Sequence, residues 1–444
     1  MSAAVALRAI LDVRRDEVPA VLWSFSYFFC LLCGYYILRP VREEMGVQGG
    51  VENLQWLYTG TFITILALVP LFGAASARWP RARLLPAVYV FFSANLLVFY
   101  FLMRAHVAPM WVAAAFFIWL SAFNMVVVSV FWSFMADIFS NEQARRLFGL
   151  IAAGGSVGAV SGPLITAALV KVLGIANLLL VATVLLVLTV VSIHRLSAWA
   201  ERHGSVSQKE ARAGLGGGMW AGVRLTFSSR YLLGIAALIL AVAVLNTFLY
   251  FEQARMVKDW SASPEERTQL FAQMDLAVNA LALICQAAVV QFLIVRLGIP
   301  VLLTAVMAAS GLGYLTLAAA PVLPVLVVFQ VLRRAADYSM LRPVREVLFT
   351  VVSREEKYKA KNFIDTVVLR GGDAASGWVS AGLKALGAGT AAVALIAAPI
   401  AFLSALLSWF LGREQEALKS SAPRAQGSAT QASSLDTAPA SSGR

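Results

Sequence analysis

The chain of 444 residues contains little charge, few cysteines and few histidines. Charged residues make up 14% and hydrophobic residues 60% of the sequence, whereas a soluble domain carries about 25% and 45–50%. This balance excludes a soluble enzyme, a disordered protein and a water-soluble nucleic-acid-binding protein. Cys30, Cys33 and Cys285 all lie in apolar runs, which argues against a disulfide framework. The three histidines are scattered and no Walker A motif is present, so we expect no metal site, no cofactor and no built-in ATP-driven pump.

The chain contains many long apolar runs. A transmembrane helix needs about 20 mostly apolar residues, and the chain offers twelve such segments. They are 18–45, 54–75, 84–103, 111–136, 147–170, 175–193, 231–251, 270–295, 298–319, 322–352, 362–387 and 389–411. The sequence therefore predicts an all-α integral membrane protein with twelve transmembrane helices, whose surroundings are a lipid bilayer.

The distribution of lysine and arginine predicts the orientation. Most of these residues outside the spans fall on the side that holds the N-terminus, which by the positive-inside rule makes both termini cytoplasmic. We expect the inner membrane of a bacterium. The predicted parts are a cytoplasmic N-terminus (1–17), a six-helix bundle (18–193), a cytoplasmic linker (194–230), a second six-helix bundle (231–411) and a disordered cytoplasmic tail (412–444).

One hexapeptide, Leu-Arg-Pro-Val-Arg-Glu, occurs at 38–43 and again at 341–346, on the predicted first and tenth spans. These spans would each begin a three-helix unit, and transporters are commonly built from such repeats around a central site. The first span runs outward and the tenth inward, so the copies would lie toward opposite leaflets, as inverted repeats do. Independent placement of arginines at the membrane interface is the alternative.

Several arginines lie within the predicted spans, where a charge costs about 2.5–3.5 kcal/mol and usually faces a cavity or a partner. Arg333 and Arg334 follow Val322 by about 16 Å of helix, which places them near mid-membrane. Arginine suits a phosphate because its planar guanidinium gives bidentate, permanently charged donors. The candidate substrate-binding arginines are Arg39, Arg42, Arg333, Arg334, Arg342 and Arg345.

Ion pairing within one helix is the competing interpretation. Glu43, Asp337 and Glu346 each follow an arginine by four positions, a spacing that allows a pair on one helix face. A substrate could displace Glu43 or Glu346 from the arginines, and the pairs would reform as it leaves. Arg39 and Arg42 could instead reach the headgroups.

The eleventh predicted span carries Asp365, Arg370 and Asp373. Arg370 and Asp373 are three positions apart and can pair. Asp365 and Asp373 share a helix face and could carry protons or guide a cation. In the fifth predicted span, Gly154, Gly158 and Gly162 repeat every four residues, which predicts close packing against another helix and leaves open a part in gating.

The loop after the second span resembles a motif of the major facilitator superfamily. Residues 73–81 are similar to its Gly-x-x-x-Asp-Arg-x-Gly-Arg loop, with Ala77 where aspartate and Pro80 where glycine are usual. Asp137, Arg145 and Arg146 are similar to the related loop between the fourth and fifth spans, which implies a gating role. The implied fold has two six-helix halves that rock around a midplane cavity.

The chain also resembles the non-mitochondrial ATP/ADP translocases. The similarity lies in residues 39–43, 131–137 and 362–373 and extends over nearly all of 16–411. It implies exchange of a nucleotide as the small anionic substrate and a substrate-binding role for Glu252 besides the arginines of the hexapeptides. Separately, we expect a monomer. Two alternatives stay open: proton-coupled transport of another solute (a drug, lipid or sugar phosphate), and a non-transporting membrane scaffold. No catalytic dyad favours an enzyme.

Overall fold

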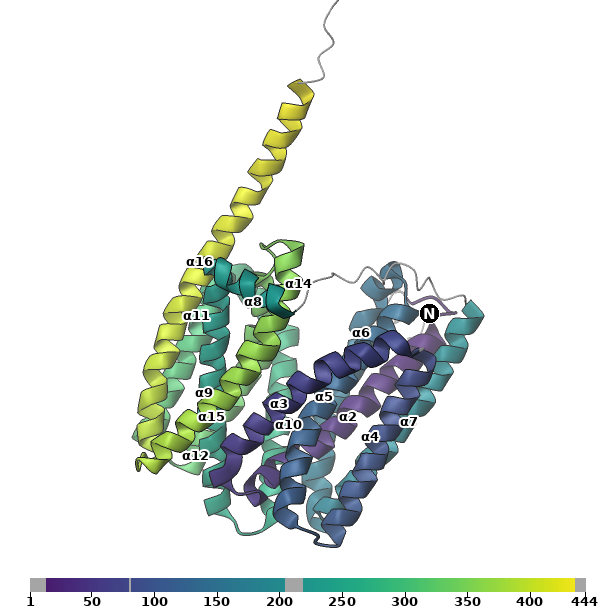
Figure 1. Ribbon diagram of the computed structural model, residues 1–444, viewed down its shortest axis with the longest axis vertical. Helices are drawn as coiled ribbons and strands as arrows, with labels where there is room; N and C mark the ends of the chain where they lie inside the picture. Colours follow the sequence, from purple (N-terminus) through teal and green to yellow (C-terminus); the bar gives the residue numbers. More distant parts are fainter. Residues whose placement is uncertain (1–12, 80, 204–218, 436–444) are drawn as a thin grey trace, which may run out of the picture.

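The computed structural model describes residues 13–79, 81–203 and 219–435, nearly all of which are helical. The helices form two bundles that stand side by side, purple to blue and teal to yellow in Figure 1. The first bundle consists of α2 (Val18–Gln48), a 3-10 turn η1 (Val51–Asn53), α3 (Leu54–Arg78), α4 (Arg81–Arg104), α5 (Pro109–Ile138), α6 (Asn141–Leu173) and α7 (Ile175–His203).

The second bundle includes two helical runs that change their winding. Its elements are α8 (Met219–Ser228), α9 (Arg230–Trp260), α10 (Pro264–Ala288), α11 (Val290–Ala319), α12 (Leu323–Ala336), η2 (Asp337–Leu341), α13 (Arg342–Leu348), α14 (Arg354–Phe363), η3 (Ile364–Val368), α15 (Leu369–Ala385) and α16 (Thr390–Leu435). The segments η2 and η3 are π-helical, a winding that is frequent at functional sites.

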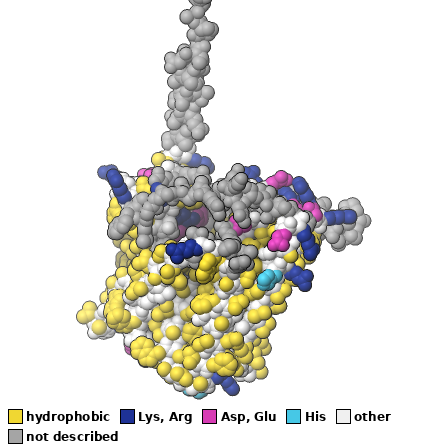
Figure 2. Space-filling view, turned by 45° about the vertical axis from the view of Figure 1, so that its right-hand side comes forward, with side chains coloured by type: hydrophobic (Ala, Val, Ile, Leu, Met, Phe, Trp, Pro, Cys, Tyr) yellow, Lys and Arg dark blue, Asp and Glu magenta, His cyan; other side chains and the backbone are white. Residues whose placement is uncertain are grey.

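Ten helices of the described residues are long and apolar enough to cross a membrane. The chain is therefore a multi-pass membrane protein, and Figure 2 shows a broad apolar surface with most charged side chains gathered near one end. The predicted spans 322–352 and 362–387 correspond to α12–η2–α13 and α14–η3–α15, which are not among the ten. The count of twelve spans and the three-helix repeats stay predictions.

Two predicted boundaries differ from the structure. The eighth and ninth spans were expected at 270–295 and 298–319, whereas α10 ends at Ala288 and α11 begins at Val290. Residues 288–295 are apolar apart from Gln291, so hydropathy does not locate the break between the helices. Gly298, the first residue of the predicted ninth span, lies inside α11 at a kink with φ of 75°, a conformation that glycine adopts without a steric penalty.

The last helix extends into the region predicted as a disordered tail. α16 continues from the final apolar span through the good helix formers of 413–419 and on to Leu435, since an existing helix needs no new nucleation. The remaining tail residues, 436–444, lie outside the described part, as do 1–12 of the N-terminus and 204–218 of the linker.

Each bundle has its own apolar core. In the first bundle, α2 packs against α5, α6 and α7, with Tyr27, Leu31 and Phe131 fully buried. The three spaced glycines explain how α6 approaches α2. A Cβ atom at Gly154, Gly158 or Gly162 would lie 2.5–2.6 Å from a backbone carbonyl oxygen of α2. These glycines therefore allow direct backbone contact, as their spacing predicts.

Candidate functional site

The two bundles enclose a cavity of about 510 Å³, a volume within the range of pockets that hold small ligands. Its walls come from α2, α3 and α5 of the first bundle and from α9, α12, η2, α13, η3 and α15 of the second. Both hexapeptides contribute to the same cavity, through Arg39, Arg42 and Glu43 on one side and Arg342 and Arg345 on the other.

The lining is strongly charged and dominated by arginine. Six arginines and four carboxylates line the cavity: Arg39, Arg42, Arg334, Arg342, Arg345, Arg370, Glu43, Asp337, Asp365 and Asp373. All ten charged residues belong to the set of candidate site residues predicted from the sequence. Their roles in substrate binding and coupling stay predictions. The excess of arginine favours an anionic ligand.

Arg39 of α2 and Arg334 of α12 meet at one carboxylate, that of Asp275 in α10. Their Nη atoms lie 3.1 Å and 2.7 Å from the same oxygen, Asp275 Oδ1. Asp275 is 2% exposed, and its other carboxylate oxygen has no hydrogen-bond partner among the described residues. One buried acid thus joins arginines from the two bundles.

Arg42 is fixed from three sides. Its Nη1 lies 3.1 Å from a carboxylate oxygen of Glu43, and its Nε donates to Ser121 Oγ at 3.1 Å. Its guanidinium carbon lies 3.7 Å from the ring centre of Phe117, a cation–π contact. These contacts hold the guanidinium at the cavity wall in one orientation.

The second hexapeptide presents its arginines from the region where η2 joins α13. Arg342 Nε donates to Asp337 Oδ2 at 2.9 Å, and the same guanidinium lies 4.2 Å from the Tyr338 ring centre. Arg345 forms a 3.4 Å ion pair with Asp365. The Arg342 side chain is 58% exposed, so it is the most accessible cation of the two hexapeptides.

The predicted pairs at four-residue spacing do not form. Asp337 contacts Arg342 instead of Arg333, because the π-helical winding of η2 brings residues five positions apart together. In α2, Arg39 pairs with Asp275 of α10, which leaves Glu43 to its neighbour Arg42.

Glu346 likewise has a partner other than the one expected from its spacing. Its carboxylate pairs with Lys361 of α14, and Arg345 approaches to 4.0 Å. By contrast, the predicted pair between Arg370 and Asp373 is present, at 3.3 Å. Thr247 also donates to Asp373, at 3.5 Å.

Two residues predicted to bind substrate do not line the cavity. Arg333 donates to the side-chain oxygen of Asn246 at 2.5 Å. Glu252 is buried and accepts hydrogen bonds from Arg255 at 2.6 Å and Thr390 at 2.6 Å. Glu252 lies at a separate cavity of about 410 Å³. A substrate-binding role for it remains a prediction from the resemblance.

Sequence reasoning missed several cavity residues that carry no charge. Tyr58, Tyr250 and Tyr338 line the wall, together with the amides of Gln253 and Gln330. Nothing in the local sequence distinguishes these side chains from ordinary packing residues. Asp275 was also missed as a site residue, although a lone carboxylate inside an apolar span is a signal that could have found it.

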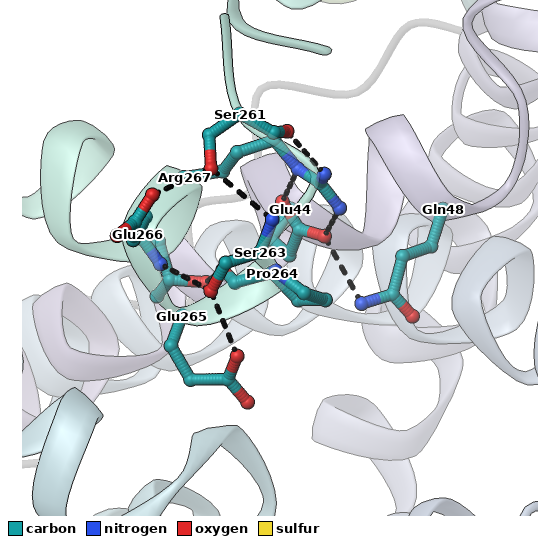
Figure 3. A network of polar contacts seen from close by, with 9 residues as sticks. Glu44, Gln48, Ser261, Ser263, Pro264, Glu265, Glu266 and Arg267 are labelled. Atoms are coloured by element: carbon teal, nitrogen blue, oxygen red, sulfur yellow. Dashed lines mark hydrogen bonds and ion pairs between the residues drawn. The ribbon is translucent and has the colours of Figure 1, made fainter.

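One end of the molecule is closed by contacts between the bundles. An interbundle cluster joins Val47, Val51, Leu54, Leu57 and Phe117 of the first bundle to Phe251, Ala254, Val257 and Phe271 of the second. Beside it, Glu44 of α2 is completely buried and receives two hydrogen bonds from Arg267 of α10, at 2.5 Å and 2.8 Å. Figure 3 shows this bidentate pair, with Gln48 and Ser261 completing the network.

A second polar network lies at the other end of the first bundle. Glu17, just before α2, accepts hydrogen bonds from Arg146 at 2.8 Å and 3.2 Å and from Gln143 at 3.0 Å. Burial alone would raise the pKa of Glu17, but the hydrogen bonds from Arg146, Gln143 and the Arg14 backbone outweigh it and lower this pKa below its ordinary value.

Of the other residues predicted to take part in gating, Arg145 is exposed and Asp137 is half-buried near the end of α5. A gating role for these residues stays a prediction. The described part of the chain contains no group of three histidine, cysteine, aspartate or glutamate residues able to hold a metal ion.

Comparisons with known proteins identify the fold. A family model described as Major Facilitator Superfamily matches residues 23–341. No curated protein matches the chain.

Similar solved structures include a variant of the nucleoside transporter NupG, 14% identical, covering 88% of this chain and 99% of that one, with a TM-score of 0.64. A bacterial homologue of the iron transporter ferroportin is 13% identical and covers 90% and 98%, with a TM-score of 0.63. An auto-inhibited POT family peptide transporter is 14% identical and covers 90% and 97%, with a TM-score of 0.62. At this identity the likeness to solved structures shows the fold alone. Because the family model covers most of the sequence, the chain belongs to the major facilitator superfamily.

Proposed function

We propose that the chain is a secondary active transporter that binds a phosphorylated anion in the arginine-lined cavity and moves it by alternating access. The observation that carries this proposal is the convergence of six arginines from both bundles on one cavity. Guanidinium groups match phosphate oxygens with bidentate, permanently charged donors. A site shared by both bundles is also what rocking of one bundle against the other requires.

The proposed substrate is a nucleotide, exchanged in the manner of an ATP/ADP antiporter. The resemblance to the translocases supports this choice, and the composition of the cavity wall is compatible with it. Tyrosine rings such as those of Tyr58 and Tyr250 offer faces on which a base can stack. The amides of Asn246, Gln253 and Gln330 offer hydrogen bonds to a base or a sugar.

Proton-coupled transport of another solute is the second candidate. Asp365 and Asp373 line the same cavity as the arginines, and carboxylates in such positions serve as proton carriers in transporters. The two candidates differ in their driving force: an exchanger needs substrate on the far side, while a proton-coupled carrier stops when the proton gradient collapses.

The proposed setting is the inner membrane of a bacterium, with a monomeric carrier and both termini in the cytoplasm. The concentration of lysine and arginine on one side of the predicted topology supports this orientation. The twelve predicted spans, in two halves of six, belong to the same proposal.

Arg342→Ala tests the proposal in proteoliposomes loaded with unlabelled ATP and supplied with labelled ADP. Arg342 is a largely exposed cation at the cavity, and a hydrogen bond from a charged group contributes about 1.5–3 kcal/mol. We expect exchange at low substrate to fall at least tenfold while insertion stays normal. Arg296→Ala is the control, because Arg296 packs on Phe292 of α11 outside the cavity. Equal exchange in the two variants would contradict the role of the cavity.

A further inference from the structure

Asp275 lies between the two bundles and contacts one arginine from each. It lies on α10, which packs against α2 and α6 of the first bundle and α12 of the second. Its carboxylate contacts Arg39 and Arg334 through the same oxygen. Both arginines line the cavity, whereas Asp275 is buried behind them and is not part of the wall.

This arrangement leaves the cluster incompletely neutralised. One carboxylate faces two guanidinium groups, so the three side chains together carry one positive charge. Each guanidinium has five N–H donors, and Asp275 accepts one hydrogen bond from each. The cluster thus remains attractive to an anion in the cavity, but less so than two free arginines would be.

A buried carboxylate behind a pair of arginines weakens the binding of every anion that these arginines contact. For a carrier this matters, because a substrate held too tightly is not released on the other side. The sequence alone predicts that Glu43 or Glu346 is the carboxylate that competes with a substrate for the arginines. In the structure their carboxylates contact Arg42, Arg345 and Lys361.

We propose that Asp275 is a fixed counter-charge that sets how tightly the cavity holds a phosphate-type anion, by sharing Arg39 and Arg334 with it. The inference rests on the proposed function in one respect, that an anion binds in this cavity. Asp275 itself does not touch the substrate; it acts through the two arginines and is a positioning residue.

Asp275→Asn is the informative variant. Asparagine has nearly the same shape and still accepts hydrogen bonds from both arginines, but it removes the negative charge. Removing one unit charge beside a partly buried cation pair is expected to tighten anion binding about tenfold or more. We expect the KM for exchange and the Kd for inorganic triphosphate to fall together, and the maximal exchange rate to fall because release is slower.

Glu17→Gln is the matched control. Glu17 is 1% exposed and also pairs with an arginine, Arg146, but both residues belong to the first bundle and lie outside the cavity. Loss of its charge is expected to leave the affinity for triphosphate within about twofold of the wild type. A merely structural role for Asp275 would make the two variants alike, with weaker or unchanged binding.

The double variant Asp275→Asn/Arg334→Gln covers the case in which the single variant does not fold. It restores the original net charge of the cluster, and its triphosphate affinity is expected to return to within a few fold of the wild type. An affinity in Asp275→Asn that is unchanged or weaker overturns the inference. If Asp275→Asn does not fold, a triphosphate affinity of the double variant far from that of the wild type overturns the inference. A wild-type protein that binds neither triphosphate nor ATP would instead overturn the proposed function.

Discussion

Removal of Arg267 should open the closed end of the molecule. Arg267→Gln leaves the carboxylate of Glu44 fully buried without its bidentate partner. Breaking a buried ion pair by removing one partner costs about 3–5 kcal/mol. The cost applies to the closed arrangement, since Glu44 reaches water once the two bundles part. At about 1.4 kcal/mol per factor of ten, the equilibrium would move toward opening by about 100-fold or more.

A buried cysteine reports this opening. Val51 belongs to the interbundle cluster and is 5% exposed, so Val51→Cys is expected to react slowly with a maleimide while the end is closed. The three native cysteines, Cys30, Cys33 and Cys285, are first replaced. In purified protein, Arg267→Gln should raise the labelling rate at position 51 by at least tenfold.

Lys258→Gln provides the control at the same end of the molecule. Lys258 also joins the bundles, through Glu52 at 3.0 Å, but both side chains are exposed. An exposed pair contributes about 0–1 kcal/mol, so this variant should change the labelling rate by only a few fold. If Arg267→Gln labels no faster than Lys258→Gln, the buried pair does not hold this end closed.

Two further predictions concern packing and pH. Gly158→Leu should prevent folding, because a side chain there meets the carbonyl of Phe29. Gly149→Ala, which has open space around it, should keep or slightly raise the melting temperature. Thermal unfolding in detergent compares the two variants, and normal folding of Gly158→Leu would contradict the packing account. Glu17 has a lowered pKa, so its stabilising contribution is present above its ordinary value of 4.5 and is lost as the pH falls through the lowered pKa. Glu17→Gln should therefore lower the melting temperature at neutral pH and progressively less in acid, and a pH-independent difference would refute the role of its pair with Arg146.

The general character of the site could be predicted from the sequence because its signals are chemical. Charges inside apolar spans are rare enough to mark a cavity, and both copies of the hexapeptide, about 300 positions apart, supplied candidate substrate-binding arginines. The structure indeed brings Arg39 and Arg42 to the same cavity as Arg342 and Arg345.

The individual pairings could not be predicted, because they depend on geometry that spacing does not record. A π-helical segment moved the partner of Asp337 from the residue four positions before it to the residue five positions after it. The acid between Arg39 and Arg334 comes from α10, more than 200 positions from Arg39 in the chain. Hydropathy also could not locate the end of α10, since apolar residues continue into α11.

The most direct test of the account is labelled ADP uptake into proteoliposomes of the wild-type protein, with and without internal ATP, and with and without a proton gradient. The account predicts uptake that requires internal nucleotide and is unaffected when the gradient is collapsed. Uptake that needs the gradient and ignores internal nucleotide, or no nucleotide uptake by correctly inserted protein, would contradict it.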